Sequence, residues 1–205
     1  ICVMYLLALH LAKARNTHSL GELQDIGSEL LKLPAQIAEV LENSSSIREL
    51  AKSYKDAKTV LFLGRNVGFP IAMEGALKLK ELAYIHSEGF AAGELKHGPI
   101  ALIEQGQPVI VVVPSPNDPD SLHAKVISNI QEVRARGAEV IAIAEMGDTE
   151  SKKYAADVFY VPAANQMLMP ILCVIPLQIF ALELSSAKGL DVDQPRNLAK
   201  SVTVE

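Results

Sequence analysis

Two uninterrupted β-branched runs constrain the fold of this 205-residue chain more than any other feature. They are QPVIVVVP at 107–114 and AEVIAIAE at 138–145. A strand that is apolar at almost every position must be covered on both faces, and such strands are typical of parallel sheets. Three further stretches have strand character: TVLFLG at 59–64, DVFYVP at 157–162 and a shorter one near 85–90. We therefore expect five strands.

Helical segments alternate with these strands. Residues 70–85 begin with a proline and continue with good helix formers, 118–137 are amphipathic and end in glycine, and 167–188 are long and apolar. Strands that are separated by helices pair in parallel through right-handed crossovers. The sequence therefore predicts an α/β fold, a three-layer α/β/α sandwich with a five-stranded parallel sheet, doubly wound in the flavodoxin manner.

Residues 1–45 are expected to form a helical segment that precedes this domain. The chain opens with the apolar stretch ICVMYLLALHLA, which is too short to span a bilayer and has no charged residues before it. We read this opening as the interior of a helix that continues upstream, and we expect the chain to be a fragment of a larger protein. Within 21–41 the apolar residues follow a helical spacing, and Pro34 is expected to divide that helix by a kink or break.

The domain itself is expected to span 46–189. The sequence NSSS at 43–46 predicts the start of the helix that leads into it. After Gly189, residues 190–205 follow neither a helical nor a strand period, so we expect an irregular C-terminal tail. Chain ends are usually loosely ordered and have no specific role. The presence of Lys200 so late in this irregular tail therefore needs an explanation.

Composition excludes several classes of function. The net charge is −5 and no block of Lys or Arg stands out, which argues against a nucleic-acid partner. The two cysteines, Cys2 and Cys173, both lie among apolar residues and are predicted to be small core residues, with no disulfide or metal site. No histidines have metal-ligand spacing. Unpaired cysteines are typical of a reducing compartment, so we expect a cytoplasmic protein with no membrane partner.

Glu74, Lys78 and Glu81 lie at spacings of four and three, which places them on one face of a helix. Such a row is commonly a surface ion-pair ladder. However, Glu81 stands where the helix runs into an apolar strand, and a partly desolvated carboxylate at such a junction is suited to proton transfer. Both interpretations stay open at this point.

His97 is the second candidate. Gly98 and Pro99 follow it, so its imidazole is expected on a turn that holds the side chain in one direction. A single histidine of this kind is either a surface residue or a general acid–base near neutral pH. Ligands of doubly wound sheets bind beyond the carboxyl ends of the strands, so we expect a site in the loops after Leu63, after the second strand and after Val113.

Two stretches, EGALKLKELAYIHSEGFAAGELKHGPIALI at 74–103 and DQPRNLAKSVTVE at 193–205, resemble one family. They are similar to the isomerase region of glutamine–fructose-6-phosphate aminotransferases, the glucosamine-6-phosphate synthases. That region has two sugar isomerase (SIS) domains, and this chain resembles the second, preceded by the last helix of the first. The resemblance covers almost the whole chain. It implies a reaction in which fructose 6-phosphate and glutamine-derived ammonia give glucosamine 6-phosphate, through ring opening, a Schiff base and a C1–C2 proton transfer.

The resemblance also implies roles for individual residues. Lys200 matches the lysine that forms the Schiff base, and Glu81 matches the glutamate that moves the proton. His97 matches the histidine that opens the sugar ring and reaches the neighbouring subunit's site, which implies a homodimer. Lys78 matches a second lysine near the reacting carbons, and Ala199 joins Lys200 and Glu81 in binding the substrate. No cofactor and no metal are implied.

The chain departs from the family in two respects, because it has neither the glutaminase domain nor the first SIS domain with its Ser/Thr-rich phosphate loop. Since the phosphate grip positions the reacting carbons, we expect the chain alone to be nearly inactive. The tail is expected to close over the sugar, anchored by polar residues between Asp191 and Asn197. Two alternatives stay open: a non-catalytic sugar-phosphate-binding regulatory domain, and a related deglycase or ammonia-using isomerase.

Overall fold

A computed structural model describes residues 1–117 and 122–198. Its sheet has five parallel strands in the order β2-β1-β3-β4-β5. The strands are β1 Thr59–Gly64, β2 His86–Ala91, β3 Pro108–Val112, β4 Glu139–Glu145 and β5 Asp157–Val161. The predicted five-stranded parallel sheet is confirmed.

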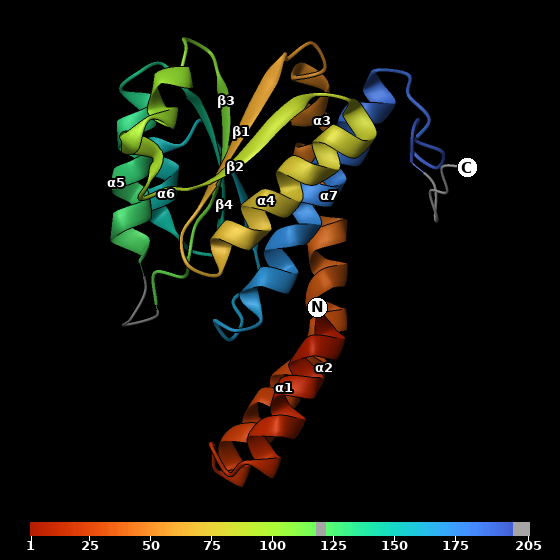
Figure 1. Cartoon of the computed structure of the whole chain (residues 1–205), viewed down its shortest axis with the longest axis vertical. Helices are drawn as coiled ribbons and strands as arrows, with labels where there is room; N and C mark the ends of the chain where they lie inside the picture. The colour runs from red at the N-terminus through yellow and green to blue at the C-terminus, as the bar shows by residue number, and fades with distance from the viewer. Residues whose placement is uncertain (118–121, 199–205) are drawn as a thin grey trace, which may run out of the picture.

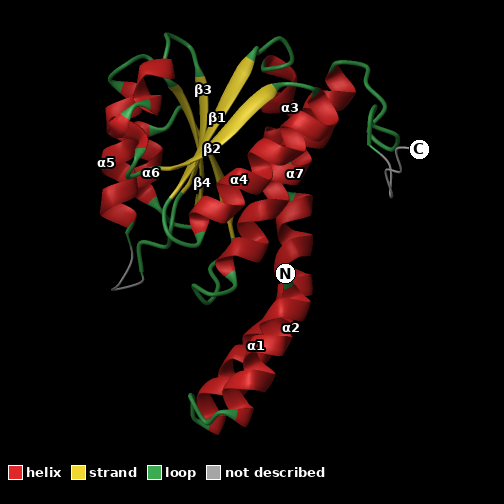
Figure 2. Cartoon of the chain, in the orientation of Figure 1, coloured by secondary structure: helices red, strands yellow, loops and turns green. Residues whose placement is uncertain are grey.

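The strands separate two cores, and alternate residues of each strand face one core or the other. In β1, Val60 and Phe62 belong to one apolar cluster, whereas Leu61 and Leu63 belong to the other. Helices α3 Ser45–Ser53, α4 Gly68–Lys78 and α7 Met169–Ala187 cover the first face, and α5 His123–Arg134 and α6 Thr149–Tyr154 cover the second. Figure 2 shows the sheet in yellow between these two groups, which confirms the three-layer sandwich.

The sequence predicted a kink or break at Pro34, and the break is wrong. Helix α2 runs without interruption over Leu20–Glu42 and contains Pro34. A proline in a helix lacks one N–H donor, but packing can hold the helix together around that gap. Here α2 lies against α7, and Leu33 and Val40 are buried in the core. A capping box at Ser19 also fixes where the helix begins.

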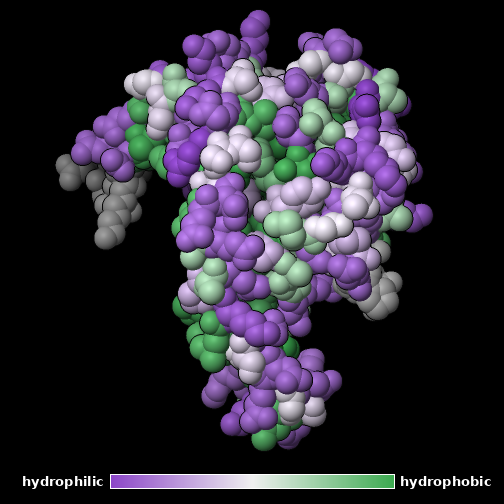
Figure 3. Space-filling view, turned by 180° about the vertical axis from the view of Figure 1, so that it is seen from behind, coloured by the Kyte–Doolittle hydropathy of each residue, from purple (hydrophilic) through white to green (hydrophobic). Residues whose placement is uncertain are grey.

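The first helix, α1 Cys2–Ala14, has no fully buried residue, although its partly buried Tyr5 packs against the first core. With the first part of α2 it forms a hairpin that projects from the sandwich (Figure 1). Apolar side chains are visible on this projection among polar ones (Figure 3), and those exposed on α1 include Val3, Met4 and Leu6. Cys2 is exposed for the same reason, so the prediction that both cysteines are core residues is wrong for Cys2.

Cys173 is buried, as predicted, and burial raises the pKa of its thiol to about 12, with the nearby Glu145 adding to the rise. It belongs to α7, a helix whose length and apolar composition would be sufficient to cross a bilayer. However, 72% of its most apolar 18-residue stretch is buried inside the fold, and buried core helices commonly have this length and composition.

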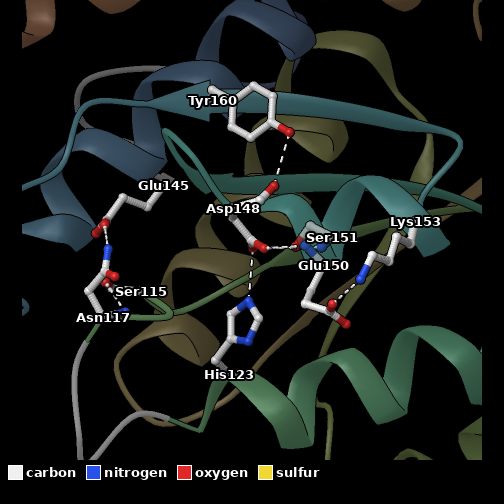
Figure 4. Close-up of polar contacts among 9 residues, drawn as sticks. All are labelled: Ser115, Asn117, His123, Glu145, Asp148, Glu150, Ser151, Lys153 and Tyr160. Atoms are coloured by element: carbon white, nitrogen blue, oxygen red, sulfur yellow. Dashed lines mark hydrogen bonds and ion pairs between the residues drawn. The ribbon is translucent and has the colours of Figure 1, made fainter.

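Loops at the carboxyl end of β4 carry a cluster of polar side chains (Figure 4). Asp148 Oδ1 accepts hydrogen bonds from the backbone N–H groups of Glu150 and Ser151, which lie in the first turn of α6. Its Oδ2 accepts from the Ser151 hydroxyl at 2.6 Å and lies 2.9 Å from His123 Nε2 at the start of α5. Tyr160 of β5 donates to the Asp148 carbonyl. The cluster thus ties β5, α5 and α6 together.

A close approach of α4 to the sheet gives the first testable prediction. A Cβ on Gly75 would lie 2.8 Å from Phe62 of β1 and 2.9 Å from Leu177 of α7. We expect Gly75→Ala to lower the free energy of unfolding by about 1–3 kcal/mol, because overpacking forces these side chains apart. Gly27→Ala in α2 is the matched control, since no atom lies within 4 Å of its Cβ position. Equal melting temperatures of the two variants would contradict the prediction.

Asp148 gives the second prediction. Burial alone raises the pKa of Asp148, but hydrogen bonds from Ser151 and His123 outweigh it and hold the pKa below its ordinary value. The carboxylate therefore stabilises the fold above the unfolded pKa of about 3.9, and this contribution is lost as the pH falls through the lower folded pKa. We expect Asp148→Asn to cost about 1–3 kcal/mol at neutral pH and the deficit to shrink in acid. Thermal unfolding across pH, with Glu150→Gln as control, measures this deficit, and a constant deficit would contradict the assignment.

Candidate functional site

The ion pairs of Lys78 confirm that Glu74, Lys78 and Glu81 share one helix face. Lys78 Nζ lies 2.5 Å from Glu81 Oε2 and 3.6 Å from Glu74 Oε1. The side chains of Lys78 and Glu81 are each about one quarter exposed. The hydrogen bond to Glu81 raises the pKa of Lys78, so this lysine carries its charge throughout the neutral range.

Glu81 lies in a π-helical turn, Leu79–Ala83, which continues α4. Such turns insert an extra residue per turn and are frequent at functional sites. The turn is held from α7, because the buried Ser185 donates a hydrogen bond of 2.6 Å to the Leu82 carbonyl. Tyr84 ends the turn in the left-handed conformation, with φ 56° and ψ 33°. The sequence-based prediction of a plain helix missed this turn.

A cleft of about 470 Å³ lies beside Glu81 and the C-terminal tail. We call it the Glu81 cleft, and its lining residues are Lys80, Glu81, Tyr84, Ile85, His86, Arg196, Asn197 and Leu198. Figure 1 shows the tail in blue next to the yellow end of α4. The predicted site residues Ala199 and Lys200 lie outside the described residues. The structure thus brings Glu81 together with the segment that immediately precedes them.

His97 does not lie in this cleft. It ends the short 3₁₀ helix Leu95–His97, which follows β2, whereas Glu81 precedes β2. The length of β2 alone separates the two positions by about 16 Å, at about 3.3 Å per residue. The His97 side chain is 63% exposed, and its Nε2 lies 3.9 Å from Glu94 Oε2. The predicted turn is confirmed: Gly98, with φ 154°, has a conformation that favours glycine.

At the carboxyl edge of the sheet, where the fold predicts a ligand, the described residues line a small cavity. The cavity between the loops after β1 and β3 measures about 40 Å³, and its lining includes Arg65, Gly68 and Ser115. This is closer to the volume of a water molecule than to that of a sugar phosphate. A larger hollow of about 710 Å³ opens at the amino ends of β1 and β3, but none of the candidate catalytic residues that the structure describes lines it. The Glu81 cleft is also at the amino end of its strand, β2.

The sequence-based prediction assigned no role to Tyr84 or to His123. Tyr84 contacts Arg196 of the tail, and His123 contacts Asp148. Both pairs join residues that are far apart in the chain, so no local pattern indicates them. Among residues 1–117 and 122–198, no group of three or more His, Cys, Asp or Glu side chains has the arrangement of a metal site.

Comparison with known proteins gives curated relatives that match the chain over its full length. A glutamine–fructose-6-phosphate aminotransferase (isomerizing) of Leifsonia xyli is 63% identical over all 205 residues, which cover 33% of that protein. The protein of the same name from Corynebacterium efficiens is 59% identical, with the same coverage. The chain therefore spans about a third of the length of the curated relatives it matches.

Solved structures agree on the fold. The C-terminal domain of glucosamine-fructose-6-phosphate aminotransferase from Francisella tularensis superposes with a TM-score of 0.85 at 36% identity, covering 93% of this chain and 52% of that one. Tagatose-6-phosphate ketose/aldose isomerase from Escherichia coli has a TM-score of 0.67 at 23% identity, covering 78% and 44%, and shows the fold alone.

The family model described as the SIS domain matches residues 53–187. The match runs from the last residue of α3 to the last residue of α7, so it includes every strand of the sheet. Because the model accounts for more than half of the residues, this chain belongs to the SIS domain family.

Proposed function

We propose that this chain is the second SIS domain and C-terminal tail of an enzyme that converts fructose 6-phosphate and glutamine-derived ammonia to glucosamine 6-phosphate. The names and high identity of the full-length relatives support this function. No observation favours the alternative of a non-catalytic sugar-phosphate sensor. Within the enzyme, the chain would contribute to sugar isomerisation, and the glutaminase domain and first SIS domain would be provided by the rest of the parent protein.

The observation that carries the proposal is the Glu81 cleft, where a carboxylate meets the segment that leads to Lys200. In the proposed reaction the free amine of Lys200 attacks the C2 carbonyl of the open-chain sugar and forms a Schiff base with loss of water. Ammonia then displaces the lysine, and Glu81 takes a proton from C1 and returns it to C2. Ala199 would contact the sugar beside Lys200.

Lys78 would act as a fixed positive charge in this reaction. Its raised pKa keeps the ammonium group protonated beside Glu81, so it is poorly suited to be a base. A cation at 2.5 Å instead orients the Glu81 carboxylate and favours negative charge that develops on the nearby sugar carbons.

His97 would serve a neighbouring copy of the chain. It lies at the other end of β2 from Glu81, and its side chain is exposed. Since general acid–base catalysis requires contact within hydrogen-bond distance, His97 would open the ring of a sugar bound to the partner subunit in a homodimer. We also propose a cytoplasmic enzyme, in keeping with the free cysteines, and one without membrane or nucleic-acid partners, the latter in keeping with the net charge of −5.

The proposed roles of Lys200 and Glu81 can be tested in the full-length enzyme. Lys200→Arg should abolish borohydride trapping of fructose 6-phosphate, because the guanidinium cannot form a Schiff base, and should lower hexosamine synthesis by about 10³-fold or more. Glu81→Gln should still allow trapping but lower kcat by about 10²- to 10⁴-fold. Peptide mass spectrometry locates the trapped sugar. Lys153→Arg and Glu150→Gln, an exposed ion pair on α6, are the matched controls. A trapped adduct on another lysine would overturn the assignment.

The shared site gives a further prediction. His97→Ala and Lys200→Arg are each expected to be inactive alone, but a mixed dimer would contain one site with both native residues. After subunits of the two variants are mixed at equal amounts and allowed to exchange, we expect up to about one quarter of native activity. Activity that stays at the level of the separate variants, with exchange verified by mass spectrometry of a tagged subunit, would place His97 in its own subunit's site.

A further inference from the structure

Tyr84 and Arg196 make two contacts, although 112 residues separate them in the chain. The backbone N–H of Arg196 donates a hydrogen bond of 2.7 Å to the Tyr84 hydroxyl. The guanidinium carbon of Arg196 lies 4.0 Å from the centroid of the Tyr84 ring, which is the geometry of a cation–π contact. One aromatic side chain therefore holds both the backbone and the side chain of a tail residue.

The backbone of Tyr84 has a conformation that a bulky residue rarely adopts. Its φ of 56° lies in the left-handed region, where aromatic residues are genuine outliers. Strained residues of this kind persist only where their surroundings hold them, and they gather at functional sites. Here the preceding π-helical turn is pinned to α7 by the bond from Ser185 to the Leu82 carbonyl. The backbone below the tail is thus fixed independently of the tail.

The tail reaches Tyr84 along an ordered path. Gly189, with φ 71°, follows the end of α7 and turns the chain. Asp191 Oδ1 then accepts hydrogen bonds from the backbone N–H groups of Asp193 and Gln194 at 2.9 and 3.1 Å, which closes a tight turn. Pro195 has no N–H group, so the next backbone donor after Gln194 is the N–H of Arg196. The Tyr84 hydroxyl accepts the hydrogen bond from this group.

We propose that Tyr84 is a positioning residue, which clamps Arg196 and so sets the point from which the tail carries Lys200 to the Glu81 cleft. The catalytic importance of placing Lys200 there rests on the proposed function. Four residues of chain reach at most about 14 Å, so this clamp would limit how far Lys200 can lie from the cleft. Glu81 precedes Tyr84 by three residues and lines the same cleft, so one short segment would place both the carboxylate and the lysine. Confinement of this kind raises the effective concentration of a reacting group.

The clamp itself can be tested without reference to the reaction. Trypsin must take the Arg196 side chain into its own pocket, which requires the guanidinium to leave the Tyr84 ring. In the full-length enzyme, we expect Tyr84→Gly to raise the initial rate of cleavage at the Arg196–Asn197 bond by about tenfold or more, and Tyr84→Phe by about threefold. Glycine suits the left-handed conformation, so Tyr84→Gly removes the clamp without backbone strain. The new amino terminus at Asn197 is followed by mass spectrometry.

The positioning role needs a second measurement. We expect Tyr84→Gly to slow borohydride trapping of fructose 6-phosphate on Lys200 by about tenfold at saturating sugar, with an unchanged melting temperature. Tyr84→Phe should retain most of the trapping rate, because it keeps the ring beneath Arg196. Combining Tyr84→Gly with Arg196→Ala should be no worse than either change alone, because both remove one interaction. Tyr160→Phe, which also loses one hydroxyl hydrogen bond, is the matched control on the far side of the sheet.

Faster cleavage together with slower trapping would support the proposal. Native cleavage and trapping rates in the Tyr84 variants would overturn it while leaving the proposed function intact. Faster cleavage with native trapping would overturn the positioning role. If the native enzyme traps no sugar on Lys200, the proposed function fails, and the proposal that depends on it fails with it.

Discussion

Burial of the central strands from both sides is the constraint on which the rest of the structure depends. Every residue of β3 is buried, and β1 and β4 have only their first residues outside the core. Because successive side chains of a strand point to opposite faces, such strands need a helical layer on each side. Each fully buried aliphatic side chain contributes about 1.5–3 kcal/mol, so no arrangement with one bare face could compete.

The same constraint explains why the candidate chemistry gathers around β2. This strand is at the edge of the sheet, and most of its residues are only partly buried. Polar groups can therefore stay solvated there without loss of core packing. The Glu81 cleft opens at the amino end of β2 and His97 stands beyond its carboxyl end, which is the physical basis for proposing a site divided between two copies. The carboxyl ends of the central strands, in contrast, are filled by side chains that satisfy one another, as around Asp148.

Local patterns in the sequence predicted local structure well. The spacing of Glu74, Lys78 and Glu81 placed them on one face, and the ion pairs of Lys78 confirm it. Pro34 shows where such patterns fail, because packing of α2 against α7 outweighs the loss of one helix hydrogen bond. Cys2 shows the reverse, since an apolar neighbourhood in sequence does not bury a residue of a helix that projects from the sandwich. Ligands of doubly wound sheets generally bind at the carboxyl edge, but the Glu81 cleft lies at the amino end of β2, so this general rule did not locate it.

By itself, the sequence determined the alternation of strands and helices, the parallel sheet and the identity of the residues that resemble a catalytic set. These properties depend on neighbours within a turn or two of the chain, which a single sequence displays directly. Only the tertiary structure decided that the turn around Glu81 is π-helical, that Tyr84 holds Arg196 and that His97 lies away from Glu81. Contacts of this kind join residues up to 112 positions apart, and they exist only because the packed core has already fixed where each segment ends.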